Sequence, residues 1–110
     1  MFRPGMGGFG GGNMQNLMRQ AQKMQEELQA QNAKAEEELE NTTLSATAGG
    51  GMVEVSITGK KKIVGVKINP NVVDPDDVEM LEDLIVAATN EAIEKANELE
   101  KELKPSIPGL

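Results

Sequence analysis

The fold is decided by residues 44–68, LSATAGGGMVEVSITGKKKIVGVKI, in which apolar and polar residues alternate over three short runs. A period of two is typical of a β-strand that buries one face and exposes the other to water. Residues 49–51 and 59–61 separate the runs, and their glycines suit tight turns between antiparallel strands. The stretch therefore predicts a three-stranded antiparallel meander.

A helical period precedes the strands, over residues 13–41. Apolar side chains recur there at spacings of three and four, which predicts a helix with one apolar face. These side chains belong to Met14, Leu17, Ala21, Met24, Leu28 and Ala35. Such a helix is about 40 Å long, which is longer than a domain of this size is wide. Part of it is therefore expected to project or to pair with another helix.

A second helical period runs from about residue 78 to Lys104, where Pro105 ends it. We expect Asp74 to cap the first free N–H groups of this helix and Pro75 to occupy its first position. The chain thus predicts an α+β fold in the order α-β-β-β-α, with the meander between two long helices.

The domain expected from these patterns covers residues 13–104 and has a tail on either side. Half of residues 1–12 are glycine, and burial cannot offset the entropy lost on ordering them, so we expect a flexible arm. Residues 105–110 are expected to form a C-terminal tail.

The amino-acid composition excludes most classes of catalytic site. The chain has no Cys and no His, which excludes disulfides, thiolate or imidazole metal sites and Ser-His-Asp triads. The acidic run at residues 74–77 lacks the further ligands of an EF-hand loop. We therefore expect no catalysis, no cofactor, no metal and no small-molecule substrate. The sequence also lacks a signal peptide or membrane span, so a cytoplasmic protein is expected.

A second copy of the chain is the expected partner. A small sheet with one helix over it, about residues 42–90, buries too little apolar surface to be stable alone. Two-fold dimerisation is the natural remedy, with helix ends left as protruding arms. The predicted interface includes part of the apolar stripe of the second helix, namely Leu81, Leu84, Ile85 and Ala88.

Charge is unevenly distributed along the chain. The net charge is −7, which taken alone argues against a polyanionic partner. Two local clusters are nevertheless basic. The first lies on the first helix and contains Arg19, Lys23 and Lys34. The second lies in the second predicted turn and contains Lys60, Lys61 and Lys62.

Three blocks of the sequence resemble the YbaB/EbfC family of bacterial nucleoid-associated DNA-binding proteins. They are MQNLMRQAQKMQEE at 14–27, GGGMVEVSITG at 49–59 and INPNVVDPDDVEMLEDLIVAATNEA at 68–92. The resemblance implies a tight homodimer shaped like tweezers, whose helical arms grip duplex DNA in the nucleoid. It also implies a functional link to replication and recombination proteins.

Arg19 and Lys23 lie one helical turn apart within the first matching block and are the residues on which we expect DNA phosphates to bind. Lys34 on the same helix is a further candidate for DNA contact. Lys60, Lys61 and Lys62 are expected to provide a secondary contact. The last helix departs from a basic pattern, because acidic residues outnumber its three lysines. Phosphate contacts without a base-reading motif predict salt-dependent binding with little sequence specificity.

Two function hypotheses remain at this point. The first is a nucleoid-associated protein that alters DNA conformation and thereby affects nucleoid organisation, gene expression or DNA protection and repair. The second is a coiled-coil scaffold or holdase, because the methionines of the first helix suit adaptable apolar contacts with other proteins. The salt dependence of duplex binding discriminates between them.

Overall fold

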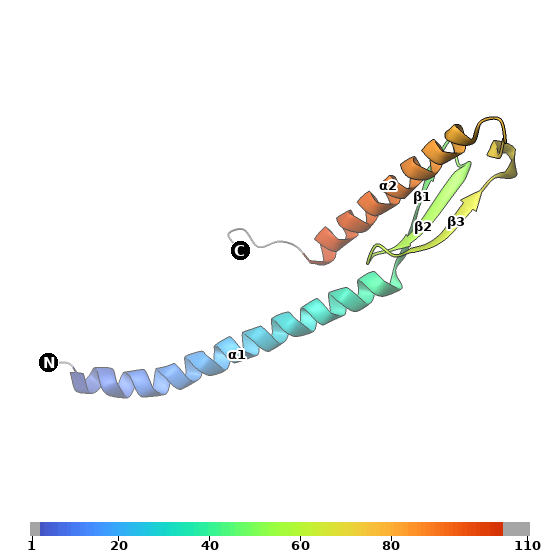
Figure 1. The fold of residues 1–110 in the computed structure, drawn as a ribbon. Helices are drawn as coiled ribbons and strands as arrows, with labels where there is room; N and C mark the ends of the chain where they lie inside the picture. The colour runs from blue at the N-terminus through green and yellow to red at the C-terminus, as the bar shows by residue number, and fades with distance from the viewer. Residues whose placement is uncertain (1–2, 105–110) are drawn as a thin grey trace. The chain divides into compact units, whose positions relative to one another are not determined.

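The computed structural model describes residues 3–104, and the side chains of residues 13–104. Its elements, in chain order, are α1 (Arg3–Asn41), β1 (Thr43–Ala48), β2 (Val53–Thr58), β3 (Ile63–Ile68), a short 3-10 helix η1 (Pro70–Val72) and α2 (Val78–Leu103) (Figure 1). This order confirms the predicted α-β-β-β-α fold. The chain divides into two compact units, Met1–Lys34 and Ala35–Leu110.

The first unit is the part of α1 that ends at Lys34. The helix begins at Arg3, earlier than the start predicted near residue 13, so residues 3–12 are helical rather than irregular. Pro4 is compatible with this start, because an N–H in the first helical turn has no partner within the helix. Residues 1 and 2 lie outside the described residues. A separate role for the segment 1–12 as an arm stays a prediction.

The second unit is built on the predicted meander. The strands lie in the order β1-β2-β3, and both neighbouring pairs are antiparallel. The register places Val55 opposite Ala46 on one side and opposite Val66 on the other. Directly paired residues share a face of the sheet, so Ala46, Val55 and Val66 lie on one face, as the alternation predicts. A register shift pairs Ile57 with Ile63 and leaves Val64 without a direct partner in β2.

Helix α2 packs on this apolar face, along β1 and β2 (Figure 1). The core between them contains Ala46, Val53, Val55, Ile57, Ala88, Ala92 and Ala96. The alanines of α2 recur at a spacing of four and let the helix approach the sheet closely. The third strand is not covered in this way: Val66 is 47% exposed and Ile68 is 39% exposed. The protomer therefore leaves part of its apolar face in contact with water.

Both turns of the meander need left-handed backbone conformations. Gly49, Gly50 and Gly51 between β1 and β2 have φ angles of 64°, 67° and 92°, which glycine adopts without steric cost. The turn between β2 and β3 has Lys61 at φ 68° instead. Its N–H donates to the carbonyl oxygen of Thr58 at 2.9 Å, and a register shift follows in the ladder. This is the geometry of a three-residue hairpin with a bulge.

The start of α2 corrects one prediction. The N-cap is Asp77, not Asp74, and its side chain accepts a hydrogen bond from the Met80 N–H at 3.3 Å. Asp74 instead closes the preceding turn, where its Oδ1 accepts from the Asp76 N–H at 2.9 Å. Pro75 lies in that turn, outside the helix. Several aspartates precede the helix, and the one next to its first turn takes the capping position.

The last turns of α1, which belong to the second unit, join the core through Ala35 and Leu39, both buried. The Thr42 hydroxyl donates to the Glu38 carbonyl oxygen and the Gly59 N–H donates to the Thr42 carbonyl oxygen, which ties the end of α1 to the β2–β3 turn.

Within the described part of the chain, no helix is long and apolar enough to cross a membrane.

Candidate nucleic-acid interface

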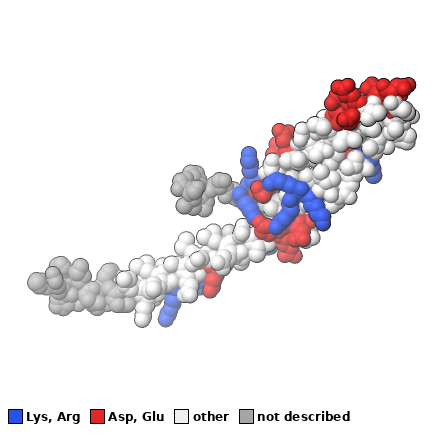
Figure 2. Space-filling model, viewed as in Figure 1, with Lys and Arg blue, Asp and Glu red and all other residues white. Residues whose placement is uncertain are grey.

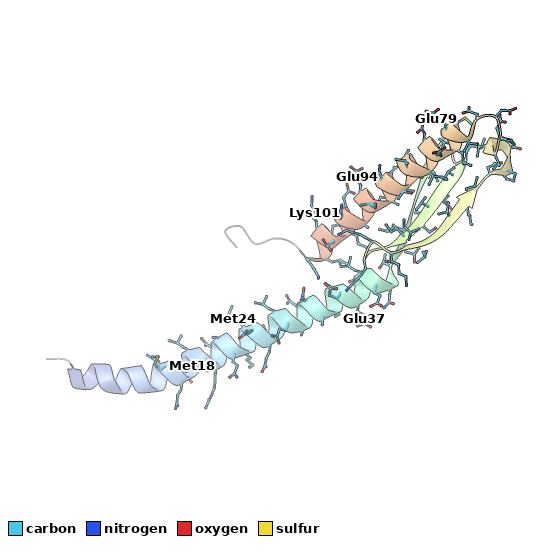
Figure 3. The ribbon with its side chains drawn as sticks, viewed as in Figure 1. Met18, Met24, Glu37, Glu79, Glu94 and Lys101 are labelled. Atoms are coloured by element: carbon cyan, nitrogen blue, oxygen red, sulfur yellow. The ribbon has the colours of Figure 1, made fainter. Side chains whose placement is uncertain are left out.

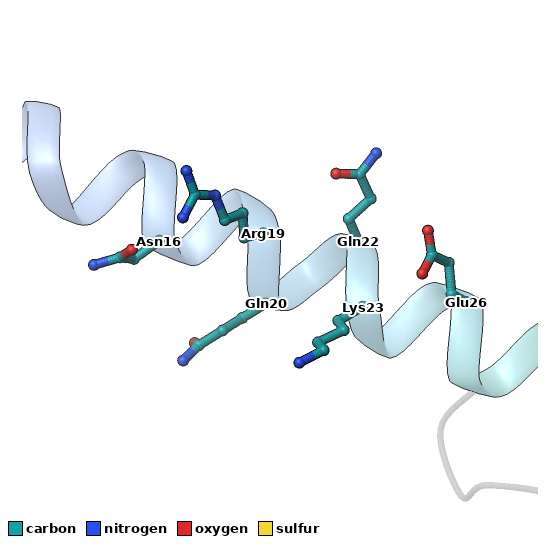
Figure 4. A pocket seen from close by; sticks show the side chains of 6 residues that line it. All are labelled: Asn16, Arg19, Gln20, Gln22, Lys23 and Glu26. Atoms are coloured by element: carbon teal, nitrogen blue, oxygen red, sulfur yellow. The ribbon is translucent and has the colours of Figure 1, made fainter.

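Arg19 and Lys23 lie on consecutive turns of α1, with Glu26 on the following turn (Figure 4). A shallow depression of about 480 Å³ lies beside them, lined by Asn16, Arg19, Gln20, Gln22, Lys23 and Glu26. All of these residues come from one helix, so the depression has one wall and holds no enclosed ligand. The surface suits contact with an extended chain of phosphates, to which two cations one turn apart can bind. Lys34 is exposed further along the same helix.

Apolar side chains on the same part of α1 are uncovered. Met14, Leu17, Met18, Met24 and Leu28 are all more than half exposed, and Met18 reaches 69%. Figure 3 shows Met18 and Met24 projecting from the helix. The sequence predicts this stripe as a packing surface, and no described side chain of the first unit covers it.

A second basic surface lies in the second unit, and its members come from two elements. We call it the lysine cluster, and it consists of Lys60, Lys61, Lys62 and Lys104. The first three lie in or directly after the β2–β3 turn, and Lys104 follows α2. Figure 2 shows lysine side chains gathered here beside acidic ones. The turn lysines predicted from sequence are thus joined by a fourth lysine that the sequence pattern does not select.

The cluster is partly neutralised by carboxylates. Glu36 of α1 forms ion pairs with both Lys60 and Lys104. Lys61 pairs with Glu100 of α2, with 3.5 Å between Nζ and Oε1. Among the described residues, no carboxylate lies within 4.0 Å of the Lys62 ammonium group, so this lysine is the member with most of its charge unopposed.

A groove beside the lysine cluster measures about 460 Å³. Its lining comes from the end of α1 and from the β2–β3 hairpin, and consists of Glu40, Asn41, Thr58, Lys60, Lys62 and Val64. Two elements form its walls, unlike the depression on α1. Because it has two walls, the groove can hold a narrow anionic strand better than a flat surface can. The carboxylate of Glu40 opposes part of the positive charge of the groove.

The cluster is held in place by a close backbone approach. A Cβ atom on Gly59 would lie 2.7 Å from the carbonyl oxygen and 2.9 Å from the Cα of Leu39. Only glycine permits this contact between the β2–β3 turn and the end of α1. Because Lys60 follows Gly59 and Glu36 precedes Leu39 by one helical turn, the contact also brings these two charged residues together.

The rest of α2 contributes little positive charge. Glu79, Glu94 and Lys101 project from α2 on the side away from the sheet (Figure 3). Lys95 is turned toward the sheet, and its Nζ donates to the carbonyl oxygen of Ser45 at 2.8 Å. The outer face of α2 is therefore mostly acidic. The structure also groups no three acidic residues into a metal site within its described part.

The predicted interface residues occupy different positions in the protomer. Ala88 is completely buried in the core at 0% exposure, so it has no surface left for a partner chain. Leu81, Leu84 and Ile85 are partly buried against the same core. Leu84 in addition covers the turn at Gly49, where an added Cβ would lie 2.8 Å from its Cδ2. An intersubunit role for these three stays a prediction.

Sequence reasoning did not find Glu36, Glu100 or Lys104 as parts of this surface. The spacing of Ala35 and Leu39 marks a buried face at the end of α1, and Glu36 lies beside it. No sequence pattern places the end of α2 next to that helix.

Two exposed basic surfaces on an α-β-β-β-α scaffold, without imidazole or thiol, together define a small protein suited to contact a polyanion.

Comparison with known proteins identifies that polyanion. The chain matches the YbaB/EbfC DNA-binding family over residues 10–109. It is 49% identical over 116 residues to a nucleoid-associated protein of Clostridium acetobutylicum, covering 100% of both chains. It is 54% identical over 103 residues to a nucleoid-associated protein of Ruminiclostridium cellulolyticum, covering 94% of this chain and 85% of that protein. The chain belongs to the YbaB/EbfC DNA-binding family.

A solved structure has the same fold. The crystal structure of an uncharacterized protein from Helicobacter pylori aligns with this chain at a TM-score of 0.69 and 25% sequence identity. The alignment covers 77% of this chain and 89% of that one. The α-β-β-β-α arrangement is therefore shared well beyond the relatives that are about half identical in sequence.

Proposed function

We propose that this chain is a nucleoid-associated protein that binds duplex DNA as a two-fold homodimer, through its phosphates and with little sequence specificity. The observation that supports this most is the lysine cluster, which gathers cations from two elements beside a groove in an otherwise acidic protein. Arg19 and Lys23 add a second cationic surface on α1. Neither surface carries an aromatic side chain for base stacking, so phosphate contacts account for the binding.

The proposed homodimer is supported by the uncovered apolar surface of the second unit. Val66 and Ile68 lie on the face of the sheet on which α2 packs, yet they remain exposed. The neighbouring flank of α2 carries two apolar residues, Val86 and Ile93, which are seven positions apart, and Glu100 follows at the same spacing. Glu100 pairs with Lys61 of the β2–β3 turn, so this flank lies on the side of α2 toward that turn.

A second copy fits this surface because it is apolar and spans both a strand and a helix. Val86 is 57% exposed although it belongs to a helix that packs on a core. A single protomer with so small a sheet buries little apolar area, and a two-fold partner would cover the remainder. The interface we propose is therefore centred on Val66, Ile68, Val86 and Ile93, next to the stripe predicted from sequence.

Duplex titration of the pure protein at two salt concentrations tests the DNA-binding proposal. Cations that replace condensed counterions make the affinity fall with salt, by a slope of about 0.9 for each phosphate contact. We expect steep weakening between about 50 and 200 mM salt, and similar affinities for unrelated duplexes. Affinity that is independent of salt would contradict the proposal.

Two charge variants locate the contact surface. Arg19→Ala, Lys23→Ala removes the cations of α1, and Lys60→Ala, Lys61→Ala, Lys62→Ala removes those of the turn. We expect both to bind more weakly and with a flatter salt slope on all duplexes tested. If only the turn variant loses affinity, α1 is not a DNA-contacting arm. Loss confined to one duplex sequence would indicate base reading instead.

The second candidate is a scaffold or holdase that binds proteins along α1. The exposed apolar stripe at Met14, Leu17, Met18, Met24 and Leu28 favours it, since thioether side chains adapt to varied apolar partners. Salt-independent capture of an unfolded client by the wild type, lost when Met18 and Met24 become Gln, would support this candidate. Under the DNA-binding proposal, effects on gene expression, DNA repair or replication partners would follow from DNA binding. That proposal assigns no catalysis to the chain.

A further inference from the structure

We infer that Glu36 is an internal competitor of DNA phosphate at the lysine cluster, so that the protein's own carboxylate limits its affinity for duplex DNA. The inference rests on the proposed DNA binding and deepens it, because it names the residue that tunes that binding. Its ligand is the phosphodiester backbone of duplex DNA.

The ion pairs of Glu36 resemble those of a bound phosphodiester. Its Oε2 pairs with the Nζ of Lys60, and its Oε1 pairs with the Nζ of Lys104. A phosphodiester likewise carries one negative charge shared between two non-bridging oxygens. The carboxylate therefore bridges two ammonium groups in the way that a backbone phosphate would, and the two anions compete for the same cations.

The carboxylate is held at this position by the fold. Ala35 and Leu39 on either side of it are buried, and Leu39 packs against Gly59. The two lysines come from the β2–β3 turn and from the end of α2, on long side chains that can reorient. A phosphate that replaces Glu36 as the partner of Lys60 and Lys104 requires movement of the lysine side chains but not of the backbone.

Other acidic residues nearby do not make the same arrangement. Glu100 pairs with Lys61 alone, through one oxygen at 3.5 Å. Glu37 is exposed on α1 next to Glu36, and within the described residues it pairs with no lysine or arginine. Glu36 is therefore distinguished by its two partners, and Glu37 provides a matched control with the same charge on the same helix.

Displacement of Glu36 is feasible because its ion pairs are exposed. The Glu36 side chain is 36% exposed, and those of Lys60 and Lys104 are 42% and 26% exposed. Ion pairs in contact with water are weak, so a phosphate can replace the carboxylate at modest cost. The same weakness limits the effect on affinity to a moderate factor, which suits reversible binding to many sites along DNA.

Duplex titrations of Glu36→Gln and Glu37→Gln test the inference. Both variants raise the net charge by one, but only the first frees Lys60 and Lys104. At about 50 mM salt we expect Glu36→Gln to bind duplex about fivefold more tightly than wild type, and Glu37→Gln less than about twofold more tightly.

A double-variant background separates lysine release from the general loss of negative charge. With Lys60→Ala and Lys104→Ala in place, adding Glu36→Gln should raise affinity no more than adding Glu37→Gln does. Circular dichroism checks that each variant remains folded, and the glutamine keeps the shape of the replaced side chain. If Glu36→Gln and Glu37→Gln bind equally tightly while the wild type binds duplex, the inference is wrong and the proposed function stands. If the wild type binds no duplex, both fail.

Discussion

Gly59 has no side chain because the backbone of Leu39 occupies the space that a Cβ would need. We expect Gly59→Ala to lower the free energy of unfolding by about 2–3 kcal/mol, since backbone atoms must shift to admit the methyl group. Urea denaturation measures the change. Gly65→Ala is the control, because the nearest atom to its added Cβ is the Ser56 Cβ at 3.9 Å, and it should leave stability within about 0.5 kcal/mol of wild type. Equal losses from both variants would contradict the contact.

Lys61 has a left-handed backbone conformation that lysine adopts only at a cost. We expect Lys61→Gly to raise the free energy of unfolding by about 1 kcal/mol, because glycine is unstrained at φ 68°. Lys61→Ala retains the strain and loses the same exposed ion pair with Glu100, so it should not raise stability. Thermal unfolding of the two variants distinguishes them, and a gain in both would show that the side chain rather than the backbone causes the strain.

At the scale of elements, the cap of α2 gives a direct test. Asp77→Ala should lower the free energy of unfolding by about 1 kcal/mol, since the Met80 N–H then has no partner within the helix or its cap. Asp76→Ala removes the same charge at the same helix end but no capping bond, and should cost less. Denaturant unfolding compares the two variants. A larger loss of stability from Asp76→Ala than from Asp77→Ala would contradict the assignment of Asp77 as the N-cap.

The elements themselves were largely predictable, because periods of two and of about four are local properties of a sequence. The alternation of Val53, Val55 and Ile57 predicts a strand and its buried face, and all three are buried. The same alternation in the third strand predicts that Val66 and Ile68 are buried, but they are exposed because α2 covers only β1 and β2. The pairing of Glu36 with Lys104 joins residues far apart in the chain, and no local pattern encodes it.

At the scale of the whole molecule, the proposed dimer interface can be disrupted without disturbing the protomer. Val86→Glu places a charge on a residue that is exposed in the protomer, so folding of one chain should be unaffected. In the proposed interface the charge would be buried without a partner, and we expect the dimer to weaken by at least about 30-fold. Sedimentation measures the effect.

Met80→Glu is the matched control for the dimer, because Met80 is also exposed on α2 but lies outside the flank shared by Val86 and Ile93. This variant should remain dimeric. If Val86→Glu associates as strongly as wild type, the interface lies elsewhere. A folded wild-type monomer at micromolar concentration would remove the homodimer from the proposal.

The sequential strand order has a consequence for how the molecule reaches its folded state. Each strand pairs with its neighbour in the chain across a short turn, so the ladder closes only small loops and loses little chain entropy before its contacts form. Folding of one chain is therefore expected to be fast. For the proposed homodimer, association of two chains is then expected to be the slow step, and the rate at which dimer appears on refolding should rise with protein concentration.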